Sequence, residues 1–134
     1  MSVLRPFNFQ KWLDENRDLL KPPVANKNLT PDSDEYIVMV VSGPNARKDY
    51  HYNETEEFFY QLEGNIVLKI IDKGVAKDVH IKEGEIYLLP SKVPHSPQRG
   101  ANTVGIVVEY PRSNDMEDAL EWYCEDCNHQ LFRA

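Results

Sequence analysis

The sequence predicts an all-β fold, a sandwich or barrel built from many short strands. Between residues 36 and 109, apolar or alternating runs of four to seven residues recur, and turn residues separate the runs. Glycine stands in three of these turns, at Gly64, Gly74 and Gly84. Short strands at close spacing are typical of sandwiches and barrels rather than of folds in which strands and helices alternate.

A short helix is expected before the strands, over residues 9–20. Its apolar residues recur at helical spacing with charged residues between them: Phe9, Trp12, Leu13, Leu19 and Leu20. The two prolines after Lys21 should end the helix, because a proline nitrogen cannot donate an amide hydrogen bond. The polar residues 24–34 are expected to form a loop.

The strands follow this loop. Residues 36–42 form a continuous apolar run rich in β-branched residues, which predicts a strand buried on both faces. Further strands are expected at residues 57–62, 66–72, 75–81, 86–89 and 103–109.

The character of the chain changes after Pro111. Residues 113–115 offer a helix N-cap, and apolar residues then recur at helical spacing: Met116, Ala119, Leu120 and Tyr123. We therefore expect a short helical C-terminal tail over residues 113–134, attached to a single domain formed by residues 1–112.

Composition limits the classes of partner. The 134 residues suit one hydrophobic core, and a net charge of −7 disfavours nucleic acid and anionic membranes. No apolar run approaches the length that crosses a bilayer, and the first residues lack a continuous apolar signal region. Cys124 and Cys127 are too close in sequence for a disulfide between them to stabilise a fold. They suit a reducing compartment, so a cytoplasmic protein is expected. Their spacing indicates half a metal site or a redox pair.

Two hairpin-like stretches carry residues typical of a metal centre. Residues 43–64 hold His51 and Glu57, and residues 84–99 supply His95, each beside glycine or proline. Any one of the three would be an ordinary polar strand residue, but together they predict a metal site. Fe(II) accepts two histidines and a carboxylate as a facial triad, and Zn²⁺ accepts the same set, so the metal stays open. The remaining histidines, His80 and His129, are interpreted as surface residues.

Charged residues near these ligands indicate an anionic substrate. Arg47 lies four residues before His51 and Arg99 four residues after His95, so on strands they would share a face with the ligands. Arginine binds a carboxylate through a planar two-point contact. Glu109 ends the last strong strand and is expected to point inward. Phe59 shares the face of Glu57 and could pack against an aromatic ring.

The glycine, proline and ligand positions resemble the two cupin motifs. The first motif matches Gly43, His51, Glu57 and Gly64, and the second matches Gly84, Pro90 and His95. This resemblance implies a cupin double-stranded β-helix, a jelly-roll barrel. Asn53 stands where the first motif has a second histidine, while Lys92 and Arg99 replace a usual glycine and asparagine. The chain thus resembles a cupin with three protein ligands, which leaves metal positions for substrate and dioxygen.

Longer stretches resemble the 3-hydroxyanthranilate 3,4-dioxygenase family: KWLDENRDLLKPPV, GPNARKDYHYNETEEFFYQLEG, YLLPSKVPHSPQR and NTVGIVVEYPR. The resemblance implies a mononuclear Fe(II) enzyme that opens the ring of 3-hydroxyanthranilate with dioxygen. The product, 2-amino-3-carboxymuconate semialdehyde, cyclises spontaneously to quinolinate and connects tryptophan breakdown to NAD synthesis. A homodimer is also implied.

The resemblance assigns roles to individual residues. His51, Glu57 and His95 match the iron ligands, and Glu57 is also expected beside the substrate. Arg99 matches the arginine that holds the substrate carboxylate, and Arg47 the one beside the dioxygen site. The remaining matches are Glu109 at the ring hydroxyl, Asn26 in the loop at the pocket mouth, and Cys124 with Cys127 as the first of two C-x-x-C pairs in a rubredoxin-like second iron site.

Two other functions stay open from the residues alone. One is a different metal-dependent cupin enzyme, an isomerase or hydrolase, and the other is a non-catalytic cupin that binds a small acid. In every case the expected partner is a small molecule, joined by dioxygen for a dioxygenase.

Overall fold

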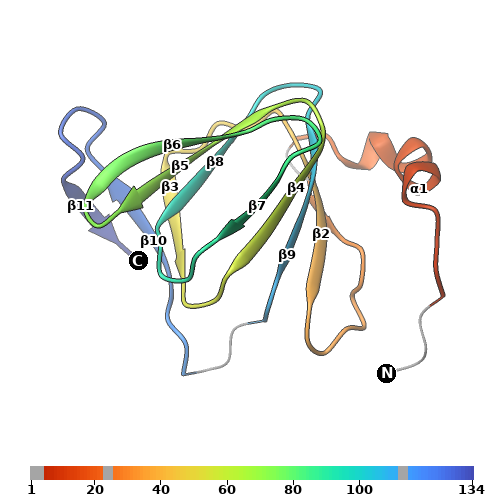
Figure 1. Cartoon of the computed structure of the whole chain (residues 1–134), viewed down its shortest axis with the longest axis horizontal. Helices are drawn as coiled ribbons and strands as arrows, with labels where there is room; N and C mark the ends of the chain where they lie inside the picture. The colour runs from red at the N-terminus through yellow and green to blue at the C-terminus, as the bar shows by residue number, and fades with distance from the viewer. Residues whose placement is uncertain (1–4, 23–25, 112–114) are drawn as a thin grey trace.

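Two antiparallel sheets face each other in the computed structural model, which describes residues 5–22, 26–111 and 115–134 (Figure 1). The five-stranded sheet has the order β1-β2-β9-β4-β7, and the six-stranded sheet has the order β11-β10-β3-β8-β5-β6. The bounds are α1 Phe9–Asn16, β1 Asn26–Asn28, β2 Ile37–Ser42, β3 Asp49–Asn53, β4 Glu57–Glu63, β5 Ile66–Asp72, β6 Val75–Ile81, β7 Ile86–Leu89, β8 His95–Arg99, β9 Val104–Glu109, β10 Asp118–Tyr123 and β11 Gln130–Arg133. The all-β prediction is confirmed.

The predicted N-terminal helix is present as α1 followed by one 3-10 turn, Arg17–Leu19. The side chain of Asn8 caps it by accepting a hydrogen bond from the Lys11 amide at 2.8 Å. Leu13 is fully buried and packs with Val40 of β2 and Val104 of β9, on the outer side of the five-stranded sheet. The described part of the chain has no helix long and apolar enough to cross a membrane.

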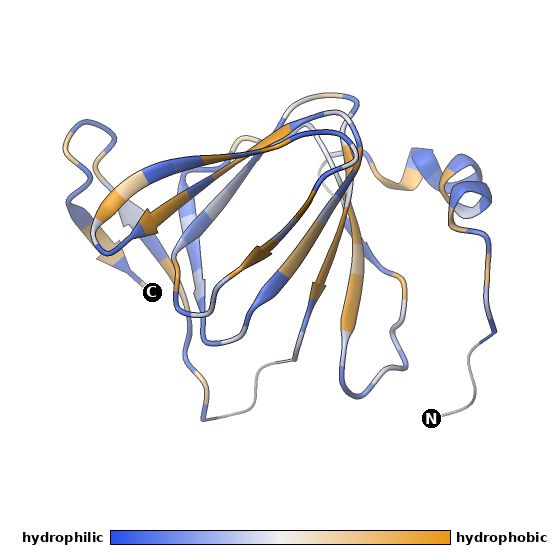
Figure 2. Ribbon diagram, in the orientation of Figure 1, coloured by the Kyte–Doolittle hydropathy of each residue, from blue (hydrophilic) through white to orange (hydrophobic). Residues whose placement is uncertain are grey.

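A second apolar cluster fills the space between the two sheets. It contains Phe59, Ile66, Leu68, Ile70, Ile81, Leu89 and Val107. Because α1 covers one face of β2 and the sheet interior the other, β2 has apolar neighbours on both sides, as its continuous apolar run predicts. Figure 2 shows this hydrophobic character along β2 and β9.

The two hairpin-like stretches are not hairpins. β3 and β4 belong to different sheets, and so do β7 and β8. Asn53 helps the chain cross between sheets, since its Oδ1 accepts hydrogen bonds from the amide and hydroxyl of Thr55 at 2.8 and 3.0 Å. The polar loop expected over residues 24–34 also contains a short strand, β1, which pairs with the edge of β2.

The predicted helical tail is wrong, because residues 118–123 form strand β10 and residues 130–133 form β11. The spacing of Ala119, Leu120 and Tyr123 suits a helix, but burial alternates, with Ala119 and Glu121 buried. β10 pairs with β3 over five residues, and this pairing overrides the local helical pattern. Most of the predicted N-cap, at Ser113 and Asn114, lies outside the described residues, as does the boundary at residues 112–113.

Candidate metal centre

Three ligand-type side chains converge between the sheets. His51 on β3 lies directly opposite His95 on β8, and Glu57 comes from β4 of the facing sheet. Oε1 of Glu57 is 3.6 Å from Nδ1 of His51 and 3.3 Å from Nε2 of His95. The three ligand atoms lie within 4.8 Å of one another, so one ion can contact all of them.

Each histidine is held on the side away from Glu57. Nδ1 of His95 lies 2.9 Å from the carbonyl oxygen of Val93. Nε2 of His51 lies 2.5 Å from Oδ1 of Asp118 on β10. A neutral imidazole that donates from its outer nitrogen keeps a lone pair on the inner one, which is the form that binds a metal. Both rings are therefore arranged as metal ligands.

Glu57 is held as a carboxylate. Burial by itself raises its pKa, but the electrostatic effect of the facing His51 and His95 side chains outweighs burial and holds the pKa well below the ordinary range. Asn53 also donates from Nδ2 to Oε1 of Glu57 at 2.7 Å. Asn53 therefore orients the carboxylate from the position where the cupin motif has a second histidine. Two imidazoles and one ionised carboxylate are a donor set that fits a divalent transition metal.

A cavity of about 330 Å³ opens beside these ligands. It brings together every predicted metal and substrate residue except the cysteines: Asn26, Arg47, His51, Glu57, Phe59, His95, Arg99 and Glu109. The walls include four apolar residues that the sequence did not single out: Met39, Val41, Pro97 and Val107. The cavity therefore has an apolar wall and a charged end, which suits a small aromatic acid.

Arg99 is the buried cation of the cavity, with 5% of its surface exposed. Burial and the neighbouring Arg47 lower its pKa to about 10, with Glu57 acting in the opposite direction, so the guanidinium is charged at neutral pH. Among the residues that the structure describes, nothing accepts a hydrogen bond from its buried Nη1. A buried donor without a partner is unfavourable, and an anion in the cavity would satisfy it.

Glu109 and Arg47 complete the charged end. Glu109 is buried and lies directly opposite Glu57 across the β4–β9 ladder. Arg47 precedes β3, and its Nη2 and Nε atoms lie 2.9 and 3.1 Å from Oδ2 of Asp49. Asp49 is another residue that the sequence did not reveal.

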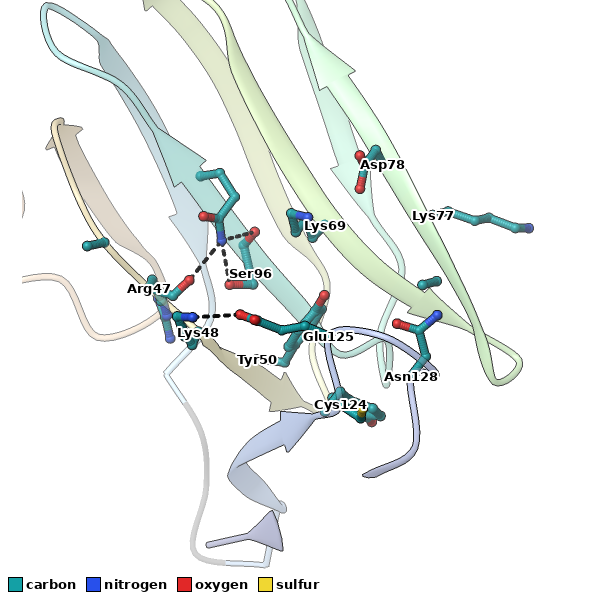
Figure 3. Close-up of a pocket in the computed structure, with 14 residues that line it drawn as sticks. Arg47, Lys48, Tyr50, Lys69, Lys77, Asp78, Ser96, Cys124, Glu125 and Asn128 are labelled. Carbon is teal, nitrogen blue, oxygen red and sulfur yellow. Dashed lines mark hydrogen bonds and ion pairs between the residues drawn. The ribbon is translucent and has the colours of Figure 1, made fainter. Parts of the chain in front are cut away.

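Arg47 also lines a second hollow on the outer side of the six-stranded sheet (Figure 3). This hollow of about 450 Å³ lies between that sheet and the turn that joins β10 to β11. Lys48 contacts Glu125 across it at 2.7 Å. Arg47 is thus the shared wall, whereas Lys48 belongs to the outer hollow alone.

The two cysteines lie in the β10–β11 turn, away from the cavity. Both are free, and hydrogen bonds from the backbone of Cys127 and Asp126 lower the pKa of Cys124. The turn is closed by hydrogen bonds from the Cys124 amide to the His129 carbonyl and from the Asn128 amide to the Cys124 carbonyl. His80 and His129 are exposed, which confirms them as surface residues.

Sequence comparison identifies relatives of this chain. A family model described as 3-hydroxyanthranilic acid dioxygenase matches residues 1–134. The 3-hydroxyanthranilate 3,4-dioxygenase of Xanthomonas euvesicatoria pv. vesicatoria is 54% identical over 132 residues, which cover 98% of this chain and 74% of the relative. The enzyme of the same name from Bacillus thuringiensis is 47% identical over 134 residues, 99% of this chain and 74% of the relative.

Structure comparison supports the cupin fold. A cupin-2 domain protein from Shewanella frigidimarina is 21% identical, with a TM-score of 0.58 over 79% of this chain and 94% of that chain. Protein NMB1881 from Neisseria meningitidis is 15% identical, with a TM-score of 0.60 over 80% of this chain and all of that chain. At these identities the likeness establishes the fold alone.

Proposed function

Because this chain belongs to the 3-hydroxyanthranilic acid dioxygenase family, we propose that it opens the aromatic ring of 3-hydroxyanthranilate with dioxygen. Both oxygen atoms enter the product, 2-amino-3-carboxymuconate semialdehyde, which cyclises to quinolinate. The observation that carries this proposal is the buried, charged Arg99, whose Nη1 has no acceptor in the described structure and which lines the same cavity as three convergent metal ligands. The substrate carboxylate supplies the missing acceptor.

His51, Glu57 and His95 would hold Fe(II) in this proposal. Bound iron would let the spin-paired substrate react with dioxygen at one centre, using metal positions that the three protein ligands leave open. The chain supplies binding and orientation. Arg99 holds the carboxylate, and Phe59 and Val107 pack against the ring. The ring hydroxyl then lies toward Glu109.

Two charged residues act on the reacting groups. Glu109, buried beside Glu57, accepts the proton that the ring hydroxyl loses. Arg47 places positive charge where dioxygen is reduced, and Asp49 fixes the direction of its guanidinium. Asn26, which lines the cavity from β1, shapes its mouth.

A single-turnover experiment tests the reaction. The protein is loaded with Fe(II) without oxygen, mixed with 3-hydroxyanthranilate and exposed to air, while absorbance and oxygen consumption are followed. We expect one dioxygen consumed per product formed. Iron-loaded protein that binds the substrate but consumes no oxygen would indicate a non-catalytic small-acid-binding cupin. Turnover supported by Zn²⁺ without oxygen would indicate a hydrolase or isomerase.

Replacing Arg47 by alanine should lower kcat by about 100-fold with little change in KM, because Arg47 stabilises charge that develops during the reaction. Steady-state rates at varied substrate and dioxygen concentrations measure both constants. Lys48→Ala is the matched control, since Lys48 is the next residue but contacts Glu125 in the outer hollow. If kcat falls equally in Arg47→Ala and Lys48→Ala, Arg47 has no specific role in the reaction.

Gly105→Ala tests the packing behind Arg99. A β-carbon at Gly105 would lie 2.7 Å from Oε1 of Gln61 and 3.1 Å from Nη1 of Arg99. Both atoms end side chains that can shift, although the backbone carbonyl oxygen of Tyr60 lies 3.3 Å from the same β-carbon, so the protein should fold with a loss of about 1–3 kcal/mol in the free energy of unfolding. Displacement of Arg99 should raise KM by roughly tenfold.

The matched control for this substitution is Gly100→Ala, because a β-carbon there meets no atom of the described residues within 4 Å. Measuring KM for both variants tests whether the position of Arg99 limits substrate binding. An unchanged KM in a folded Gly105→Ala variant would mean that the position of Arg99 does not limit substrate binding.

Further properties that the family resemblance implies are part of this proposal. Cys124 and Cys127 would donate two thiolates to a second iron, whose other two thiolates must come from outside these 134 residues. Iron content before and after the double replacement by serine measures this contribution.

A homodimer is also proposed. Exposed Ile86 and Leu88 on edge strand β7 offer an apolar surface for it, and sedimentation equilibrium tests it. The free thiols favour a cytoplasmic location.

A further inference from the structure

The side chain of Asp118, on the C-terminal hairpin β10–β11, reaches the metal centre. Its Oδ1 lies 2.5 Å from Nε2 of His51, a residue 67 positions earlier in the sequence. Nδ1 of the same ring lies 3.6 Å from Glu57. The imidazole of His51 is therefore placed between two carboxylates, with one of its nitrogens turned toward each.

The two histidine ligands are held in parallel ways that differ in charge. The outer nitrogen of His95 faces a neutral acceptor, the carbonyl of Val93, whereas the outer nitrogen of His51 faces a carboxylate. A carboxylate acceptor fixes ring orientation and tautomer, and it also makes the inner nitrogen a stronger donor to a metal. The carboxylate of Asp118 therefore makes the inner nitrogen of His51 a stronger metal ligand, an effect that the neutral carbonyl of Val93 does not give to His95.

Strand pairing fixes the position of Asp118. It is the first residue of β10 and pairs with Asn53, while Leu120, two residues on, pairs with His51. The five paired positions between β10 and β3 hold the carboxylate diagonally across from the ring. His51 is partly buried, with 18% of its side chain exposed, whereas the side chain of Asp118 is 42% exposed.

From this geometry we propose that Asp118 is a positioning residue for His51, so that the β10–β11 hairpin is a structural part of the metal centre. The inference rests on the metal site of the proposed function and not on its substrate. Asp118 acts through His51 and does not touch the ion, since it is not among the convergent ligand atoms. Its removal should weaken metal binding by loosening and weakening one of the three ligands.

The test measures Co(II) affinity of the metal-free protein by competition with a chelator, together with the visible spectrum of the Co(II) form. Asp118→Ala removes both the acceptor and the charge, and should weaken binding by about 10- to 100-fold. Asp118→Asn keeps an acceptor oxygen of the same size but loses the charge, so its affinity should fall by a smaller factor, roughly tenfold. The Co(II) spectrum should change in both variants.

Glu117→Gln is the matched control. Glu117 is the preceding residue and a carboxylate, but it pairs with Arg133 rather than with a metal ligand. It should retain wild-type affinity and spectrum. Thermal unfolding of the metal-free variants separates loss of fold from loss of positioning, and the isosteric Asp118→Asn variant is expected to unfold with wild-type cooperativity.

Wild-type affinity in both Asp118 variants would overturn the proposal, as would an equal loss in Glu117→Gln. These measurements use no substrate, so they are independent of the reaction. A wild-type protein that binds Co(II) but never turns over 3-hydroxyanthranilate would reject the proposed function and leave the role of Asp118 in place.

Discussion

Replacing Arg99 by alanine should raise the KM for 3-hydroxyanthranilate by about 100-fold and leave metal affinity unchanged. Arg99 is buried and charged at neutral pH, and its Nη1 has no acceptor among the described residues. A charge-assisted, two-point contact between arginine and carboxylate in such a place contributes about 3 kcal/mol, and each 1.4 kcal/mol is about tenfold in binding. Steady-state kinetics of the iron-loaded variant measures the change.

A substrate without the carboxylate separates this contact from general damage to the cavity. With 2-aminophenol, which keeps the hydroxyl and amino groups, the wild-type enzyme and Arg99→Ala should have similar KM values. Arg99→Lys retains the charge but not the planar fork, so it should recover only part of the affinity for 3-hydroxyanthranilate. Arg17→Ala, which removes an exposed arginine bound to Glu63, is the control. If Arg99→Ala raises KM equally for 3-hydroxyanthranilate and 2-aminophenol, Arg99 does not bind the substrate carboxylate.

Local patterns were sufficient to predict most of the barrel. β5, β6 and β7 have the bounds expected from the sequence, because glycines with positive φ at Gly64, Gly74 and Gly84 occupy the turns around them. Apolar runs located β2 and β9 within one residue. Each of these elements depends on patterns within about ten residues, which is the range over which a sequence can be interpreted without knowing its neighbours.

The candidate site was predictable to the extent that strand parity applies. Arg99 and His95 share the regular strand β8, so their even spacing correctly places both side chains in the cavity. Arg47 also lines the cavity, but it lies outside β3, and its direction depends on Asp49. Parity indicates which face a residue occupies, whereas its partner decides where its charge points.

The errors share a cause in long-range pairing. The 118–123 segment has helical spacing, and only the free edge of β3 makes it a strand. Asp118 could not be found as a neighbour of His51 while that segment was expected to be a helical tail. The sequence shows Asn53 at the position where the cupin motif has a second histidine ligand. Its hydrogen bond to Glu57 could not be predicted, because it depends on a crossover between the two sheets where a hairpin was expected.

Glu57→Gln should abolish metal-dependent stabilisation while the metal-free protein stays folded. Glu57 is the carboxylate that both histidines face, so its charge is essential for holding a divalent ion. Metal affinity should fall by more than about 100-fold, a larger loss than outer-residue changes produce. In the metal-free protein the substitution removes a buried charge, and glutamine can still accept the hydrogen bond from Asn53. Because the fold favours the charged form of Glu57, the free energy of unfolding should fall by about 1–3 kcal/mol, which leaves the metal-free protein folded.

Thermal unfolding with and without Co(II) distinguishes these effects. An ion at 100 times its Kd stabilises the wild-type protein by about 2.7 kcal/mol, which raises Tm on the order of 10 °C. Glu57→Gln should show almost no shift at the same concentration. Glu63→Gln, on the same strand but bound to Arg17 at the surface, should shift as the wild type does. If Glu57→Gln is stabilised by Co(II) like Glu63→Gln, the ion is held elsewhere. If the metal-free variant is unfolded at temperatures where the wild type is folded, the carboxylate is needed for the fold itself. A metal-free Glu57→Gln variant that still unfolds cooperatively, together with a lost metal shift, assigns Glu57 to the ion.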